Sequence, residues 1–265
     1  MLSARSFLIR GLLAGLIAGF AAFGVAFVVG EPSVNAAIAI EESGGAGHSH
    51  DESAAEPAGA ADHHAEETEV PRSLQSTVGL LTGTTVAGVT LGGLVGVLSA
   101  LALGRFGRLG PRATTLGVAA VGFVALYVVP TLAYPPNPPA VGSGDTIGMR
   151  TALYFTLVAI SVIALVAAVA VGRRLAVRWG GWYASLAAGA GYLVVALVAM
   201  ALLPSYNEVP DTFSATVLFE FRRASFLTQL TLWTVLGVIL AELAFRLTAR
   251  SGARAEATSR SVAPV

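Results

Sequence analysis

The sequence predicts an all-α membrane protein, a polytopic bundle of about six transmembrane helices. Three observations predict this class. Six apolar runs each approach the roughly 20 residues that a helix needs to cross a bilayer. Only 12% of the 265 residues are charged, about half of the fraction typical of a soluble domain. The arginines, which are the only basic residues other than histidine, gather in alternate connections between the runs.

The predicted membrane spans lie at 7–29, 78–103, 113–133, 152–171, 182–203 and 226–247. Arg5 and Arg10 precede the first run, as they would in a signal peptide. Its apolar part is long, however, and Gly30, Glu31 and Pro32 follow it in place of a small-residue cleavage site. We therefore expect a retained first helix, with a cleaved signal peptide as the alternative.

The arginines predict the orientation. Twelve of the sixteen lie in the N-terminal segment, the second-to-third and fourth-to-fifth connections, and the tail. The positive-inside rule places these segments in the cytoplasm. We therefore expect a plasma-membrane protein with both termini on the cytoplasmic side. The chain then divides into a first transmembrane helix (1–30), an extracytoplasmic loop (31–77), a five-helix transmembrane bundle (78–248) and a cytoplasmic tail (249–265) that we expect to be disordered.

In each of the first two predicted helices, glycines recur every four residues and so lie on one face. They are Gly11, Gly15 and Gly19 in the first helix and Gly88, Gly92 and Gly96 in the second. Small residues at this spacing let helix backbones approach closely in lipid. We expect these two helices to pack tightly against each other or against a partner subunit.

Several function classes are disfavoured by composition. There is no cysteine, which excludes disulfides and thiolate metal sites, and no lysine, which excludes a P-loop. No long basic run suggests nucleic acid as a partner. No fixed pair of nucleophile and base is recognisable, so we predict no catalytic residues and no enzyme.

The loop at 31–77 holds all four histidines of the chain, within a glycine- and alanine-rich acidic stretch that we expect to be flexible. Imidazole and carboxylate groups together suit divalent metals such as Co, Ni and Zn. The candidate ligands are His48, His50, Asp51, Glu52, His63, His64, Glu66 and Glu67. A solvated acidic loop with incidental histidines is the alternative. Confinement of every histidine to this loop favours metal capture, without identifying the metal.

Two further outer segments offer polar groups. The first contains four prolines, which favour a stiff, extended loop, and it ends with Asp145 and Thr146 in a position to cap the fourth helix. Asparagine and carboxylate side chains of the second lie near the membrane surface. As entry or path residues we single out Glu31, Tyr134, Asn137, Asp145, Asn207, Glu208, Asp211 and Gln229. A rigid turn and a loop lid with a structural ion pair are the alternatives. Glu242 and Arg246, four residues apart, are expected to form a structural pair.

Four stretches together resemble a known family. These are Gly30, Glu31 and Pro32 before the histidine-rich loop, residues 134–154 (YPPNPPAVGSGDTIGMRTALY), residues 207–210 (NEVP), and residues 221–229 (FRRASFLTQ) with Trp233. The chain resembles CbtA, the predicted cobalt transporter subunit, over residues 7–247. The resemblance implies cobalt uptake for corrin (vitamin B12) synthesis, together with a small single-span, histidine-bearing membrane subunit, CbtB. The family is often described with five spans, whereas this sequence predicts six.

The leading hypothesis is therefore a membrane subunit that imports cobalt, with nickel as a second candidate. Its outer loop would capture the ion, and the divalent metal would be the substrate, with no fixed cofactor. The alternative is a membrane metal sensor or scaffold that conducts nothing. The sequence leaves open whether one chain or a homo-oligomer encloses a path.

Overall fold

The computed structural model describes residues 3–45, 71–106 and 109–262. Every regular element within these ranges is helical. In chain order they are α1 (Ala4–Val25), η1 (Ala26–Gly30), α2 (Glu31–Gly45), α3 (Arg72–Leu74), η2 (Gln75–Gly79), α4 (Leu80–Ala102), α5 (Pro111–Phe123), η3 (Val124–Val128), α6 (Val129–Ala133), η4 (Gly144–Thr146), α7 (Ile147–Leu202) and α8 (Ala215–Val262). The turns η1, η2 and η3 are π-helical, and η4 is a 3₁₀ turn.

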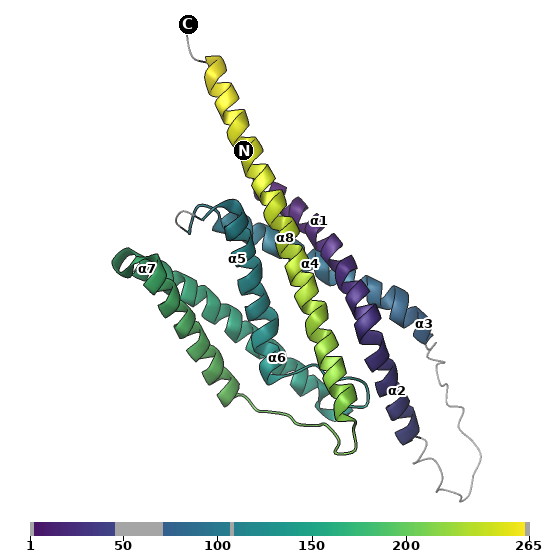
Figure 1. Ribbon diagram of the computed structural model, residues 1–265. Helices are drawn as coiled ribbons and strands as arrows, with labels where there is room; N and C mark the ends of the chain where they lie inside the picture. Colours follow the sequence, from purple (N-terminus) through teal and green to yellow (C-terminus); the bar gives the residue numbers. More distant parts are fainter. Residues whose placement is uncertain (1–2, 46–70, 107–108, 263–265) are drawn as a thin grey trace, which may run out of the picture.

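Five helical segments of the described chain are long and apolar enough to cross a membrane. One of them, Gly144–Leu202, has 59 residues and contains two of the predicted spans. Its backbone leaves helical geometry at Gly180, where φ is 75° and ψ is 163°. Glycine adopts this left-handed φ without steric cost. The chain reverses there, so α7 consists of two arms side by side (Figure 1), close to the prediction of about six transmembrane helices.

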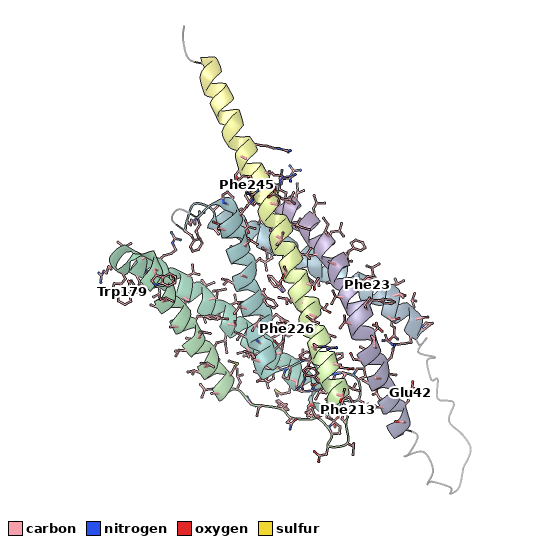
Figure 2. The ribbon with its side chains drawn as sticks, viewed as in Figure 1. Phe23, Glu42, Trp179, Phe213, Phe226 and Phe245 are labelled. Carbon is pink, nitrogen blue, oxygen red and sulfur yellow. The ribbon has the colours of Figure 1, made fainter. Side chains whose placement is uncertain are left out.

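Both termini and the reversal in α7 lie at one end of the bundle (Figure 1). Trp179 marks that reversal in Figure 2 and is 55% exposed. The connections 134–143 and 203–214 and the far end of α2 lie at the opposite end, and α3 lies at the side of the bundle (Figure 1). We call these the arginine end and the loop end, because the predicted arginine-rich connections lie at the first.

The closest contact in the bundle joins α1 and α4 through their glycine faces. A methyl group built on Gly15 would lie 2.0 Å from the carbonyl oxygen of Gly88, and one on Gly11 would lie 2.1 Å from that of Gly92. Only glycine fits where two backbones meet in this way. The expectation of tight packing is confirmed, and the partner of the first glycine face is the second helix of the same chain.

An apolar core extends from this contact to α5 and α8. It is formed by Ala14, Ala18, Ala22, Val95, Ala119, Leu232, Trp233, Leu236 and Leu240. The α7 arms are attached separately, through a small cluster in which Val129 of α6 meets Ala164, Tyr192 and Ala196 of α7. The α7 pair therefore has less packed surface than the rest of the bundle.

Two prolines explain two of the π-helical turns. Glu31 N–H bonds to the Ala26 carbonyl just before Pro32, and Val129 N–H bonds to the Val124 carbonyl just before Pro130. Proline has no N–H to donate and its ring clashes with the preceding turn. A widened turn accommodates such a residue inside a helix.

The second of these turns leaves a carbonyl that a serine satisfies. Because Pro130 cannot donate to the Ala125 carbonyl, Ser161 of α7 donates its hydroxyl to that oxygen at 2.9 Å. Ser161 Oγ also lies 2.8 Å from the Tyr192 hydroxyl. Ser161 is fully buried, so this network joins both arms of α7 to η3.

Two expected boundaries are wrong. The loop expected from residue 31 begins with helix α2, which continues from η1 as far as Gly45, and the tail expected to be disordered from residue 249 continues α8 to Val262. Both segments are rich in Ala, Glu or Arg, which favour helix. The glycines at 44 and 45 accompany the end of α2.

The predicted pair at the arginine end is confirmed and extended. Glu242 Oε1 accepts from Arg246 Nε at 2.8 Å, and Oε2 accepts from Arg112 of α5 at 2.7 Å. The Arg112 guanidinium also stacks 3.7 Å from the centre of the Phe245 ring, which is labelled in Figure 2. This exposed network ties α5 to α8 at their arginine ends, and its free-energy contribution is small because water screens it.

We expect Gly15→Ala to destabilise the protein by more than about 2 kcal/mol, because the new methyl group must push two backbones apart. Gly24→Ala on the same helix is the control, since a methyl group there meets nothing within 4 Å. Thermal unfolding of both variants in detergent measures the difference. Equal stabilities would contradict the close contact.

Ser161→Ala is expected to cost about 1–3 kcal/mol, since it leaves a buried carbonyl and a buried phenol without their shared partner. Ser185→Ala provides a matched control on the same helix, because Ser185 is exposed and its hydroxyl donates only to Trp182 O. Chemical unfolding in detergent should separate the two. Similar losses in both variants would show that the buried network contributes nothing specific.

Candidate functional site

A cavity of about 480 Å³ lies at the loop end between η3–α6, α7 and α8. We call it the loop-end cavity. Its lining residues are Tyr127, Thr131, Tyr134, Pro135, Pro136, Asn137, Val141, Ile147, Arg150, Thr151, Tyr154, Tyr206, Asn207, Glu208, Val209 and Arg222. The lining therefore combines tyrosines, amides, one carboxylate and two guanidinium groups.

Two loops cover the cavity and are tied to each other. The Tyr134 hydroxyl donates to the carbonyl of Pro204 at 2.8 Å. Glu208 Oε2 accepts from the backbone N–H of Ser143 at 2.9 Å. Prolines stiffen the first loop, because they restrict φ. The two loops consequently form one hydrogen-bonded cover.

Arg150, at the start of α7, lies beneath this cover. Its Nε is 3.4 Å from Glu208 Oε2, and its Nη2 donates to Ser143 O at 3.3 Å. Gly142 allows this approach, since a methyl group there would lie 2.5 Å from the guanidinium nitrogens. The φ of Gly142 is also 111°, a value that disfavours any other residue.

The environment of Glu208 favours its ionised form. Hydrogen bonds from the Thr146 hydroxyl and the Ser143 N–H lower the pKa of Glu208 and outweigh the opposing effect of burial, and the charge of Arg150 adds a smaller lowering effect. Glu208 is thus an anion throughout the neutral range. Burial raises the pKa of Tyr134, so its hydroxyl keeps the proton that it donates.

Arg222 of α8 forms the opposite wall. Its Nη2 donates to Asn137 Oδ1 at 2.9 Å, and its Nε lies 3.4 Å from Pro136 O. These bonds hold the proline-rich loop against α8. Phe226, one turn further along α8, packs on the rings of Phe123 and Tyr127, with distances of 6.2 and 6.4 Å between ring centres. Phe226 is labelled in Figure 2.

A second cavity of about 330 Å³ lies between η1, α2 and α8, and it shares Tyr127 and Pro136 with the first. Glu31 and Gln229 line it. Glu31 forms an ion pair with Arg72, whose Nε also donates to Asn35 Oδ1 at 3.3 Å. This pair links the two helices that flank the histidine-rich segment.

The predicted entry residues divide into three groups. Tyr134, Asn137, Asn207 and Glu208 line the loop-end cavity, whereas Glu31 and Gln229 line the second cavity. Asp145 and Asp211 line neither of these two cavities, and both are exposed. Thr146 is the N-cap residue of α7, as expected, but its side chain makes no capping hydrogen bond. Ser143 Oγ accepts from Asp145 N–H at 3.2 Å and caps the preceding turn η4.

The predicted metal ligands at 48–67 lie outside the described residues. Within the described ranges, no three His, Asp or Glu side chains come close enough to hold a metal ion together. The residues that sequence reasoning missed in the loop-end cavity include Tyr127, Arg150, Tyr154 and Arg222. One signal could have found the arginines, since both are exceptions to the alternating arginine pattern.

Comparison with protein families matches residues 4–244 to the family described as probable cobalt transporter subunit (CbtA). The chain belongs to the CbtA family. The matched region includes both cavities and both arms of α7. This CbtA-family chain is a multi-pass helical membrane protein, and its family is that of a cobalt transporter subunit. No curated protein and no solved structure gives a match.

The cover of the cavity in this CbtA-family chain should be stable to mild acid. Because the pKa of Glu208 is lowered, its stabilising effect is complete above its usual pKa of about 4.3 and is lost as pH falls through the lowered value. We expect the amide of Ser143 to stay protected from deuterium exchange at pH 5 and to lose protection in stronger acid. Mass spectrometry of the peptide around Ser143, corrected for the intrinsic rate, measures this.

Glu208→Gln should reduce Ser143 protection at neutral pH and remove its dependence on acid. Asp211→Asn is the control, because Asp211 is an exposed carboxyl group in the same loop. A Ser143 amide whose protection changes alike in both variants would contradict the role of Glu208 in the cover.

Proposed function

We propose that this chain is the membrane subunit of a cobalt uptake system that supplies corrin synthesis, with nickel as a second candidate substrate. It would lie in the plasma membrane with both termini in the cytoplasm, so that the loop end faces outward. The observation that carries the proposal is the CbtA-family match, joined to a polar cavity at the end where the histidine-rich segment is attached.

Ion capture is the first step of the proposal. The segment that contains the eight candidate ligands connects α2 to α3. Helix α2 ends at the loop end (Figure 1), and Arg72 at the start of α3 pairs with Glu31 at the start of α2. Neutral imidazole is required for ligation, so capture should weaken as pH falls through about 6.5. A high local concentration of carboxylates would also attract a divalent cation at low ionic strength.

Entry through the loop-end cavity is the second step. Tyr134, Asn137, Asn207 and Glu208 supply oxygen atoms to its lining. Opening of the hydrogen-bonded cover would admit the substrate. Asp145 and Asp211 then serve as outer rim groups, while Glu31 and Gln229 belong to a neighbouring passage along α8.

A partner subunit completes the proposal. A small single-span, histidine-bearing protein of the CbtB type would bind within the membrane, where the outer faces of the α7 arms expose large apolar side chains such as Ile163 (69%) and Leu197 (62%). Lipid also contacts such surfaces. We propose no nucleic acid partner and no enzymatic activity.

We expect simultaneous change of His48, His50, His63 and His64 to Ala to reduce uptake of radioactive cobalt severalfold at limiting concentration, with recovery at high cobalt, because capture and not conduction is lost. Ser49→Ala with Ser53→Ala is the control in the same segment. Unchanged uptake at limiting cobalt would remove the segment from the mechanism. Absence of flux in liposomes that contain both purified subunits would instead support the scaffold alternative.

A further inference from the structure

The loop-end cavity carries an excess of positive charge. Among the described residues, its lining contains the guanidinium groups of Arg150 and Arg222 and the single carboxylate of Glu208. Glu208 is already paired with Arg150 at 3.4 Å. No described carboxylate pairs with Arg222, whose bonds go to the neutral oxygens of Asn137 and Pro136. A bare divalent cation in this cavity would be repelled by the unbalanced charge.

Donor groups remain available inside the cavity. A guanidinium has five N–H groups, and Arg222 uses only two of its nitrogens in bonds to the described chain. Arg150 Nε is buried without a hydrogen-bond acceptor in the described chain, since its contact with Glu208 lacks hydrogen-bond geometry. The phenol groups of Tyr127 and Tyr154 line the same space. Guanidinium and phenol donors together match a carboxylate.

The size of the cavity also exceeds the need of one ion. A space of about 480 Å³ lies in the range that holds small organic ligands. A tricarboxylate bound to one divalent cation carries one net negative charge, which would neutralise the single positive charge that Arg222 leaves unbalanced. The charge and the volume therefore agree on the same kind of occupant.

We propose that the loop-end cavity binds a small carboxylate-bearing anion, either free or as the chelating shell of the transported metal. The second form rests on the proposed function, and the first does not. Arg222 and Arg150 hold the carboxylates, and Glu208 acts as an internal anion that the ligand displaces from Arg150. The metal then enters the cavity as an anionic complex and not as a bare cation.

The test is binding to the full-length protein in uncharged detergent, measured by titration calorimetry with citrate, with cobalt citrate and with cobalt chloride. We expect Arg222→Gln to weaken binding of citrate and of cobalt citrate roughly tenfold, the usual loss for one charge-assisted hydrogen bond. Arg223→Gln is the matched control, because Arg223 is adjacent, exposed and outside the lining. Equal losses in the two variants would overturn the proposal.

Glu208→Gln gives a test that does not depend on Arg222 for folding. Removal of this carboxylate frees Arg150, so citrate affinity should rise severalfold. A site for a bare cation predicts the opposite sign, with weaker binding of cobalt chloride. That result, or binding of cobalt chloride in preference to cobalt citrate by the unaltered protein, would overturn the proposal. So would competition by phosphatidylglycerol without any binding of citrate.

The two proposals fail in distinguishable ways. Citrate binding that depends on Arg222, in a protein that moves no cobalt in cells, would keep the anion site and remove the transport function. Cobalt uptake by a protein that binds no citrate at millimolar concentration would keep the function and remove the anion site.

Discussion

The contact between the glycine faces of α1 and α4 is the constraint on which the other helices depend. A carbonyl oxygen of one helix lies where a methyl group of the other would otherwise be, as Gly15 and Gly88 show. Because lipid supplies no hydrophobic force between helices, close van der Waals contact must hold them together. The joined pair presents Ala14 and Ala18 to the leucines of α8, and α8 in turn positions α5. The same pairing sets Arg72, at the start of α3, beside Glu31.

Packing at the loop end is less complete than at the contact between α1 and α4. Pro32 and Pro130 each follow a widened turn, and these two turns contribute Ala26, Gly30 and Tyr127 to the two cavities. The α7 arms are attached to the bundle near this level through Ser161, and they diverge from α5 toward the arginine end (Figure 1). Polar groups inside a membrane bundle usually face a cavity or a partner. The polar lining therefore lies where the apolar core stops.

Part of the candidate site was predictable and part was not. Tyr134, Asn137, Asn207 and Glu208 were recognisable as polar groups near the membrane surface, and the structure brings them to one cavity. Asp145 and Asp211 have the same local character in sequence, but both are exposed and line neither cavity. The arginines carried a weaker signal. Arg72, Arg150 and Arg222 break the alternating pattern, and each has a specific partner in the structure. The charge excess in the cavity follows from these partners and from no motif.

The sequence by itself determined the class of the protein, the positions of the spans and the glycine faces that join the first two helices. These features depend on the length, hydropathy and periodicity of continuous segments, which are local properties of the chain. Only the tertiary structure decided which arginine keeps an unpaired charge and which residues share a cavity. Ser143 and Glu208 are 65 positions apart, and Asn137 and Arg222 are 85 apart. The physical reason is that such pairs form through the packing of whole helices, and no spacing along one helix records that packing.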